Sequence, residues 1–199
     1  MVLERLLDGV QIEAFERAID GLRELALGDP QAKGAVTGTE HLPLDTGLAP
    51  AIDAGLLHAR VLEAVTHVIG PRHQIKNVSY RSPRPGFGQQ GLHADWTAPG
   101  VAGSYQVATV LVALVAFTAS NGSTRVVPGS HRCGKLPPRL RANADRHPGE
   151  IRLTGPAGTA FVFNGHLWHS GTRNDSDAPR PAMLASFWRA HAFNPQPAS

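Results

Sequence analysis

Three residues of this chain have the types and spacing of a metal-binding set. His93 and Asp95 lie two positions apart in the run Gly91-Leu92-His93-Ala94-Asp95-Trp96, and His169 lies far downstream. On a β-strand, side chains at positions i and i+2 point to the same face, so a His-x-Asp pair can hold one ion together. Two histidines and one carboxylate form the facial set that binds non-haem Fe(II) and leaves coordination positions open for oxygen chemistry. The spacing therefore predicts an iron centre at His93 and Asp95, with His169 as the candidate third ligand.

On its own, a His-x-Asp pair is a weak signal. Asp95 fits a turn cap and His93 fits a half-buried strand residue without any metal. The ligand prediction therefore depends on the stretches that surround the pair and the distant histidine.

The composition describes a globular chain with many turns. At 199 residues, with 42% apolar and 18% charged residues, it is long enough for one domain with a core. The 21 glycines and 16 prolines favour an all-β architecture. Cys133 is the only cysteine, which excludes an intrachain disulfide and a thiolate metal cage.

Charge and hydropathy limit the partners. The formal net charge is +3 and the sequence pI is about 9.5, but the arginines are scattered, which does not favour nucleic acid. An anionic small substrate or a carboxylate co-substrate fits the same balance. We find no signal-peptide pattern and no apolar run long enough for a membrane span, so a cytoplasmic location is expected.

The elements that position the candidate ligands are two helices followed by about eight short strands. Apolar residues at helical spacing predict a helix over residues 10–26 and a second over 53–69, the latter burying Leu57, Val61, Val65 and Val68. The segment 33–50 between them is polar and rich in glycine and proline, and we expect an ordered loop or lid there. Strands are predicted at 74–81, 92–96, 106–117, 124–127, 150–153, 159–163 and 182–190, with a long basic loop over 132–149.

This order of elements predicts a double-stranded β-helix, the cupin-like jelly roll, packed against N-terminal helices. The run 106–117 is apolar at nearly every position, as in a strand buried on both faces. We expect a single oxygenase domain over 1–199, with a mainly helical part over 1–70 and a β core over 71–192.

Several stretches carry a resemblance to a known family. The run Asn121-Gly-Ser-Thr-Arg-Val-Val-Pro-Gly-Ser-His131 reads locally as a turn, a strand and a second turn. Its order of residues resembles the NGxLxxxPGSH stretch of the phytanoyl-CoA dioxygenase (PhyH) family of Fe(II)/2-oxoglutarate-dependent oxygenases. The likeness extends from about Tyr80 to Trp188. In this pattern His131 is expected to be a structural turn residue rather than a ligand.

The run Phe163-Asn-Gly-His-Leu-Trp-His169-Ser-Gly-Thr-Arg-Asn174 resembles the distal segment of the same family. There the third metal ligand is a histidine that follows an apolar or aromatic residue, and an asparagine comes five residues later. His169 and Asn174 match those places. His166 is the competing histidine, but three residues from His169 on an extended chain it should face the opposite side.

The resemblance also implies how a co-substrate is held. In the family, an arginine eleven residues beyond the distal histidine binds the distal carboxylate of 2-oxoglutarate, and Arg180 has this spacing. A guanidinium binds a carboxylate bidentately and keeps its charge. The family often has a serine where this chain has Gly171, so the neighbouring Ser170 is assigned to the co-substrate, together with Gln90. Gln90 fits a solvated loop equally well.

The resemblance implies a dioxygenase that uses Fe(II), 2-oxoglutarate and O2 to hydroxylate, or otherwise oxidise, an unactivated C–H bond of a small molecule. Bacterial secondary metabolism is the expected setting. Asp95 argues against a halogenase, since family members of that type have a small residue at this position. Two alternatives stay open, a jelly-roll metalloenzyme that does not use 2-oxoglutarate and a non-catalytic binding domain of the same fold. No nucleic-acid or membrane partner is expected, and the oligomeric state is not predicted.

The chain also departs from the family pattern. The strand that usually precedes the first helix is not evident, and Val115 and Ala116 replace acidic residues before the Asn-Gly turn. Arg81, Arg84 and Arg125 are candidates to bind an acidic substrate, although solvated loop or strand charges are the expected outcome, because arginine is seldom fully buried.

Overall fold

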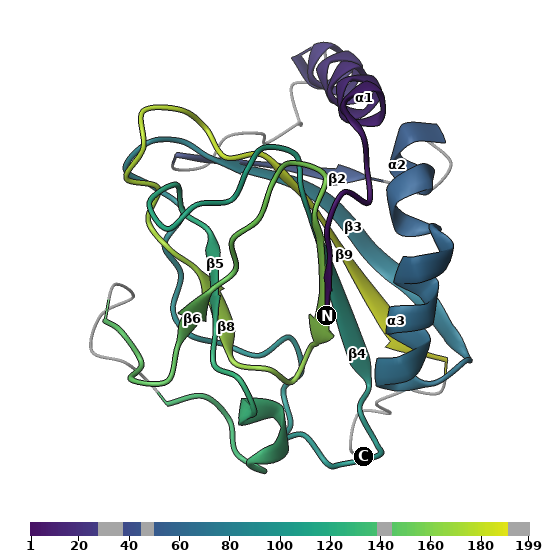
Figure 1. Cartoon of the computed structure of the whole chain (residues 1–199), viewed down its shortest axis with the longest axis vertical. Helices are drawn as coiled ribbons and strands as arrows, with labels where there is room; N and C mark the ends of the chain where they lie inside the picture. Colours follow the sequence, from purple (N-terminus) through teal and green to yellow (C-terminus); the bar gives the residue numbers. More distant parts are fainter. Residues whose placement is uncertain (28–37, 45–49, 139–144, 191–199) are drawn as a thin grey trace.

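Two antiparallel sheets face each other in this protein, as Figure 1 shows for the computed structural model, which describes residues 1–27, 38–44, 50–138 and 145–190. Helices α2 and α3 lie on the outer side of the larger sheet (Figure 1). The elements in chain order are β1 (Val2–Leu3), α1 (Gly9–Leu27), β2 (Thr39–Leu44), α2 (Pro50–Leu56), α3 (Ala59–Ile69), β3 (His73–Pro83), β4 (Val107–Ala113), β5 (Thr124–Val126), the 3-10 turn η1 (Ser130–Arg132), β6 (Ile151–Arg152), β7 (Ala160–Asn164), β8 (His169–Gly171) and β9 (Ala182–Arg189).

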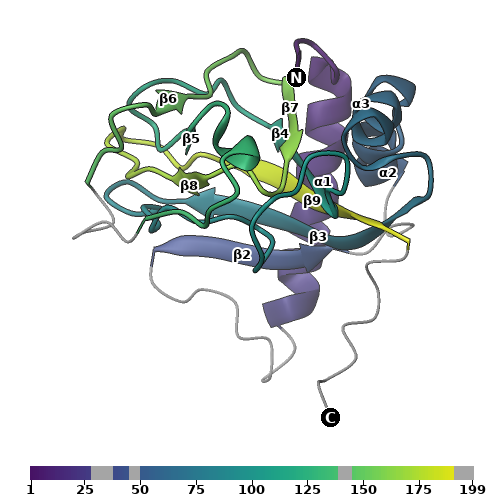
Figure 2. The ribbon, with the colours of Figure 1, turned by 90° about the horizontal axis from the view of Figure 1, so that it is seen from below.

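The strand order identifies the architecture. The larger sheet runs β1-β7-β4-β9-β3-β2 and the smaller one β6-β5-β8. Figure 2, turned by 90°, shows the smaller sheet stacked over β9, β3 and β2 of the larger sheet. The predicted double-stranded β-helix is confirmed.

Strand β4 shows why the two faces of the larger sheet differ. All seven of its residues are buried, as predicted for the apolar run. Ala108, Val110 and Val112 pack into the core that includes the helices. Thr109 and Leu111 point the other way, into a cavity between the sheets. Alternation along a central strand therefore separates the structural core from the polar interior.

The helical part differs from prediction at one point. The first helix is confirmed as α1, with Phe15 and Ile19 fully buried. The single helix expected over 53–69 is wrong, because the chain breaks into α2 and α3. His58 has extended backbone angles and caps α3 by accepting a hydrogen bond from the Arg60 amide, and Leu57, expected in the core, is 50% exposed. None of the described helices combines the length and apolar character that a membrane span requires.

Two strands in the N-terminal part were not predicted. Strand β1 pairs with β7 through Val2 and Leu3, so the expectation that no strand precedes the first helix is wrong. Strand β2 occupies residues 39–44 of the segment expected to be a loop or lid, and it pairs with β3 over its whole length. The region 1–70 is therefore not purely helical. Residues 33–37 and 45–49 of that segment lie outside the described residues.

Candidate metal and co-substrate site

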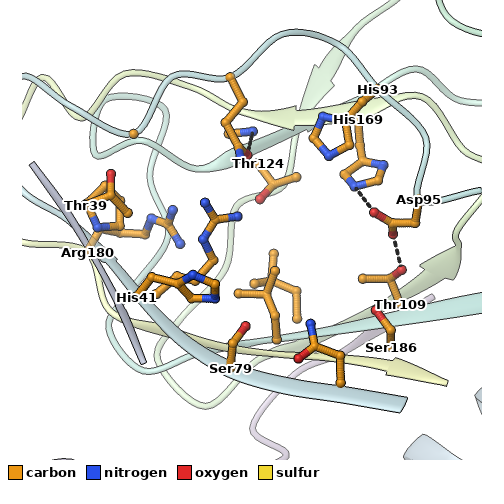
Figure 3. Close-up of a pocket in the computed structure, with 18 of the residues that line it drawn as sticks. Thr39, His41, Ser79, His93, Asp95, Thr109, Thr124, His169, Arg180 and Ser186 are labelled. Atoms are coloured by element: carbon orange, nitrogen blue, oxygen red, sulfur yellow. Dashed lines mark hydrogen bonds and ion pairs between the residues drawn. The ribbon is translucent and has the colours of Figure 1, made fainter. Parts of the chain in front are cut away.

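A cavity of about 210 Å³ lies between the two sheets, and all three predicted metal ligands line it. Figure 3 shows His93, His169 and Asp95 together at one end of the cavity and Arg180 at the other. The inner faces of β3, β4 and β9 supply the floor. Asp95 is the only carboxylate among the described residues that line this cavity, so the cavity carries an excess of positive side chains.

The predicted ligands are brought together by a single backbone pairing. His93 does not lie on a regular strand, contrary to expectation, but it forms an isolated bridge with His169. The two residues exchange N–H···O=C hydrogen bonds of 2.9 and 2.8 Å. Asp95, two residues on, points into the same space, and the ligand atoms of the three side chains lie within 4.8 Å of one another. His93 and Asp95 therefore face the same cavity, as predicted for positions i and i+2 of a strand, although only one bridge is formed there.

Both histidine rings are oriented by the backbone. The Nδ1 atom of His93 lies 2.8 Å from the carbonyl oxygen of Gly91, and that of His169 lies 2.8 Å from the carbonyl of Leu167. Since a carbonyl oxygen only accepts, Nδ1 carries a proton in both rings, and Nε2 is the nitrogen left to bind a metal. A histidine that donates from one nitrogen and presents the other is the usual arrangement at a metal.

The third ligand is held by a strand of the larger sheet. The hydroxyl of Thr109 donates to Oδ2 of Asp95 at 2.5 Å, and Oδ1 lies 3.4 Å from Nε2 of His169. One carboxylate oxygen is therefore fixed by β4 while the other faces the histidine. This pairing leaves Oδ1 directed at the space that a shared ion would fill.

Burial and mutual charge shift the titration of these groups. Burial lowers the pKa of His93, and the neighbouring His169 adds to that effect. Burial alone would also lower the pKa of His169, but the hydrogen bond and charge of Asp95 outweigh it and the pKa is raised. Burial would raise the pKa of Asp95, yet its hydrogen bond to His169 leaves that pKa lowered. Asp95 is thus held as a carboxylate, the form that binds a cation.

The competing histidine is excluded by its direction. The Nε2 atom of His166 accepts a hydrogen bond of 3.3 Å from the amide of Gln106, and its ring lies beside Trp96 and Tyr105. His166 does not line the cavity and is not part of the ligand cluster. The expected choice of His169 over His166 agrees with this geometry.

Arg180 is a buried cation that faces the cavity. It is 6% exposed, its guanidinium lies 4.5 Å from the centre of the Phe117 ring, and its Nε has no hydrogen-bond partner among the described residues. Burial, with a contribution from Arg81, lowers its pKa to about 10. A buried guanidinium with an unused donor is suited to bind a carboxylate brought in by a ligand.

The two other residues assigned to this cavity have different outcomes. Gln90 lines the cavity, with Oε1 accepting from the amide of Gly171 at 3.2 Å, so it is not a solvated loop residue. Ser170 does not line the cavity, so the geometry does not support its assignment to the co-substrate. Its hydroxyl accepts a hydrogen bond from Arg125 instead, because alternation along β8 sends it away from the face of His169.

Sequence reasoning missed one charged residue of the cavity. Arg81 was expected to be solvated, but it lines the cavity from β3, as do Asn77 and Ser79. The alternation was readable, since Val78 and Tyr80 between them are buried in the helix-side core. Two guanidinium groups, Arg81 and Arg180, therefore face one cavity.

The His/Asp/His cluster of this two-sheet jelly roll is the ligand set typical of non-haem Fe(II) oxygenases, and the same cavity holds a buried arginine whose Nε has no partner among the described residues. The family model of phytanoyl-CoA dioxygenase (PhyH) matches residues 1–182, and the chain belongs to this family.

Similar proteins agree with this membership. The dioxygenase cdmA of Talaromyces verruculosus is 26% identical over 98% of this chain and 70% of its own length. This chain spans only 27% to 50% of the length of the other curated relatives compared.

Two solved structures share the fold. HygX from Streptomyces hygroscopicus, with nickel and 2-oxoglutarate bound, has a TM-score of 0.72 at 16% identity, covering 96% of this chain and 82% of HygX. The epimerase SnoN, in complex with Fe3+, alpha ketoglutarate and nogalamycin RO, has a TM-score of 0.70 at 19% identity, covering 100% of this chain and 86% of SnoN.

Proposed function

We propose that this protein is an Fe(II)- and 2-oxoglutarate-dependent dioxygenase that oxidises an unactivated C–H bond of a small molecule, with hydroxylation as the expected outcome. The observation that carries the proposal is the pairing of two features in one cavity. One end presents two Nε2 atoms and a carboxylate oxygen, and the other presents a buried guanidinium that has no anionic partner within the described part of the chain. This is the donor set for iron together with an anion site for the co-substrate.

The residues have distinct tasks in this proposal. His93, Asp95 and His169 hold the iron, and Arg180 binds the distal carboxylate of 2-oxoglutarate. Bound iron, with 2-oxoglutarate and O2, would supply the oxidising chemistry, in which 2-oxoglutarate becomes succinate and CO2 while a substrate C–H bond is broken. Thr109 keeps the Asp95 carboxylate oriented through its hydrogen bond.

The apolar wall has a protective role in the proposal. Phe163 packs edge-on against the His169 ring with centroids 5.0 Å apart, and Leu111 and Leu184 line the same cavity. Apolar side chains beside the ligands limit the access of bulk water, which reduces side reactions at a reactive site.

The substrate is proposed only as a class. Solved structures of the same fold hold hygromycin B in HygX and nogalamycin RO in SnoN, which are small molecules. A small-molecule substrate in bacterial secondary metabolism is consistent with those neighbours. Because SnoN is an epimerase, product analysis is needed to distinguish hydroxylation from other outcomes of C–H cleavage.

An anaerobic titration tests the proposal. Apo-protein is loaded with Fe(II) and then with 2-oxoglutarate, and the visible metal-to-ligand charge-transfer band of the chelate is recorded. We expect the band in the wild type and in His166→Ala, and its loss in His169→Ala. Fe(II) binding without a band would favour a metalloenzyme that does not use 2-oxoglutarate. Binding of neither would favour a non-catalytic domain, and a band that needs His166 instead would refute the ligand assignment.

A further inference from the structure

Arg125 is a fully buried cation in β5, the strand that pairs with β8, which carries the candidate ligand His169. It is the central residue of β5 and is 2% exposed, so the expectation of a solvated charge is wrong. Arginine is rarely buried to this extent unless its donors are satisfied. Its position in the smaller sheet is opposite Ser170 of β8, to which it is paired in register.

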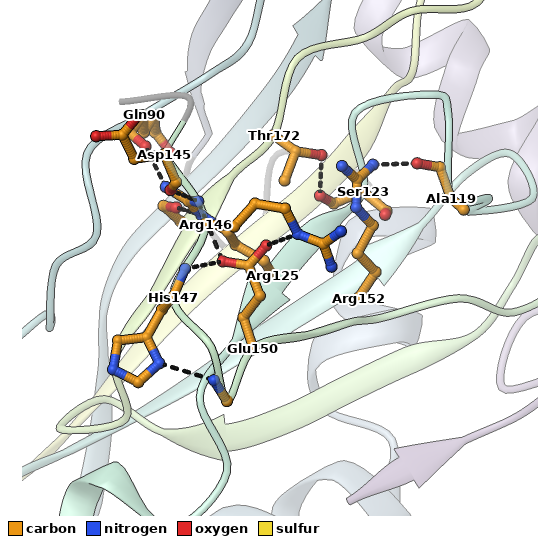
Figure 4. A network of polar contacts seen from close by, with 12 residues as sticks. Gln90, Ala119, Ser123, Arg125, Asp145, Arg146, His147, Glu150, Arg152 and Thr172 are labelled. Carbon is orange, nitrogen blue, oxygen red and sulfur yellow. Dashed lines mark hydrogen bonds and ion pairs between the residues drawn. The ribbon is translucent and has the colours of Figure 1, made fainter. Parts of the chain in front are cut away.

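The guanidinium of Arg125 is hydrogen-bonded in several directions, and Figure 4 shows the network. Its Nε donates to the hydroxyl of Ser170 at 2.6 Å. One terminal nitrogen donates to the carbonyl of Asp145 at 2.5 Å and to a carboxylate oxygen of Glu150 at 3.1 Å. The other donates to the carbonyl of Gln90 at 3.3 Å. One side chain thus joins β8, the loop before the first metal ligand, and the segment that precedes β6.

Two of these contacts adjoin the candidate site. Ser170 follows His169 directly in β8. Gln90 lies three residues before His93, and it is bonded to Gly171 from both its amide (3.0 Å) and its side chain (3.2 Å). Both Gln90 and Gly171 line the cavity. Arg125 therefore forms hydrogen bonds with both of the chain segments that carry the candidate histidine ligands.

The ion pair with Glu150 does not by itself explain this arrangement. The Glu150 side chain is also 2% exposed, and it accepts further hydrogen bonds from Arg146 at 3.2 Å and from the amide of His147 at 3.0 Å. A buried ion pair is seldom more stabilising than a well-packed apolar pair of similar size. What an apolar pair cannot supply is the set of directed donors that fixes separate segments against each other.

We propose that Arg125 is a positioning residue for the metal and co-substrate site, acting through Ser170 on His169 and through the Gln90 carbonyl on the loop that leads to His93. The inference rests on the proposed function, since it assumes that the cavity binds Fe(II) and 2-oxoglutarate. Contacts one step removed from metal ligands typically change metal affinity or activity by about 10- to 100-fold.

The test uses variants that separate folding from positioning. Arg125→Met alone leaves the buried Glu150 carboxylate with only the exposed Arg146 and the His147 amide as partners, so the informative variant is the double substitution Arg125→Met/Glu150→Met, which removes both buried charges. The matched control is Arg23→Met/Glu40→Met, which removes a bidentate pair with N–O distances of 2.7 Å on the helix side of the larger sheet. Each protein is assayed for its melting temperature, for Fe(II) affinity, and for the position of the charge-transfer band and Kd of 2-oxoglutarate.

We expect the Arg125/Glu150 double variant to melt near the wild type, to bind Fe(II) or 2-oxoglutarate about tenfold more weakly or worse, and to show a shifted band. The control should keep the wild-type band and Kd. A double variant that melts near the wild type and keeps its band position and both affinities would overturn the proposal.

Ser170→Ala keeps the test decisive if the double variant does not fold. It removes only the hydroxyl that links Arg125 to β8, and it should weaken binding in the same direction by a smaller factor. Unchanged affinities in Ser170→Ala would then overturn the proposal. Failure of the proposed function is distinguishable, because in that case the wild type itself would show no band.

Discussion

Replacing Arg180 by methionine should make the ligand-free protein more stable and abolish its response to 2-oxoglutarate. The guanidinium is 6% exposed and has no carboxylate partner among the described residues. Each pKa unit corresponds to about 1.36 kcal/mol, so the lowering of its pKa from 12.5 to about 10 amounts to about 3 kcal/mol of unfavourable free energy for the charged form. Because the folded pKa lies below the unfolded one, this cost is present in full at every pH below about 10.

The expected gain is smaller than this figure. Methionine loses the contact of the cation with the Phe117 ring, worth about 0.5–1 kcal/mol or somewhat more when desolvated. We therefore expect Arg180→Met to raise the free energy of unfolding of the apo-protein by about 1–2 kcal/mol. At roughly 2–4 °C per kcal/mol for a chain of this size, the melting temperature should rise by several degrees.

With 2-oxoglutarate and metal present, the wild type should become more stable to unfolding than Arg180→Met. At a 2-oxoglutarate concentration about 100 times its Kd, with metal present, the wild type gains about 2.7 kcal/mol by mass action. The variant should gain nothing, because the charge that binds the distal carboxylate is absent. Thermal melts of both proteins, with and without 2-oxoglutarate, measure the two effects in one experiment.

Arg84→Met is the matched control, since Arg84 is an exposed arginine nearby that does not line the cavity. It should change neither the apo melting temperature nor the response to 2-oxoglutarate. An Arg180→Met protein that melts lower than the wild type without ligand would refute the claim that this cation is held at a cost. A preserved response to 2-oxoglutarate would refute its role as the anion site.

Three further substitutions follow from the same geometry. Thr109→Val removes the hydrogen bond that fixes Asp95 and should weaken Fe(II) binding by about tenfold with little change in melting temperature, as measured by anaerobic titration; unchanged affinity would show that the hydroxyl is not needed. Arg81→Met relieves the repulsion between the two guanidinium groups and should raise the apo melting temperature, while a fall would contradict a shared cationic cavity. Asp95→Gly should lose hydroxylation together with 2-oxoglutarate-dependent succinate formation, and undiminished turnover would dismiss the facial set.

The sequence predicted what depends on local spacing. The long apolar run around β4, the first helix and the His-x-Asp pair are all visible in periodicity or motif, and the structure contains them. The break between α2 and α3 was missed because apolar residues continue through it at helical spacing. It is the extended backbone of His58 that ends the pattern. Strand β2 was missed because only Leu42 and Leu44 in it are buried.

The positions of two residues near the site were predicted wrongly, because the alternation of side chains along their strands was not followed by one further residue. Because His169 faces the cavity, Ser170 faces away from it, and Arg81 shares a face with Ser79. Arg125 is a different case. Its partner Glu150 lies 25 residues further along the chain, and no local pattern indicates that a strand arginine will meet a carboxylate across a long loop.

Strand β9 has a position in the larger sheet with consequences for synthesis. It follows every other described strand in the chain, yet it lies in the interior of the sheet, paired with β4 on one side and β3 on the other. Until residues 182–189 have been synthesised, β4 and β3 lack the strand that lies between them. Nascent chains of this kind expose edges that can pair with other chains, and contacts of long sequence separation form slowly. Arg180 lies two residues before β9, so the anion site is expected to be complete only after β9 has paired with its two neighbours.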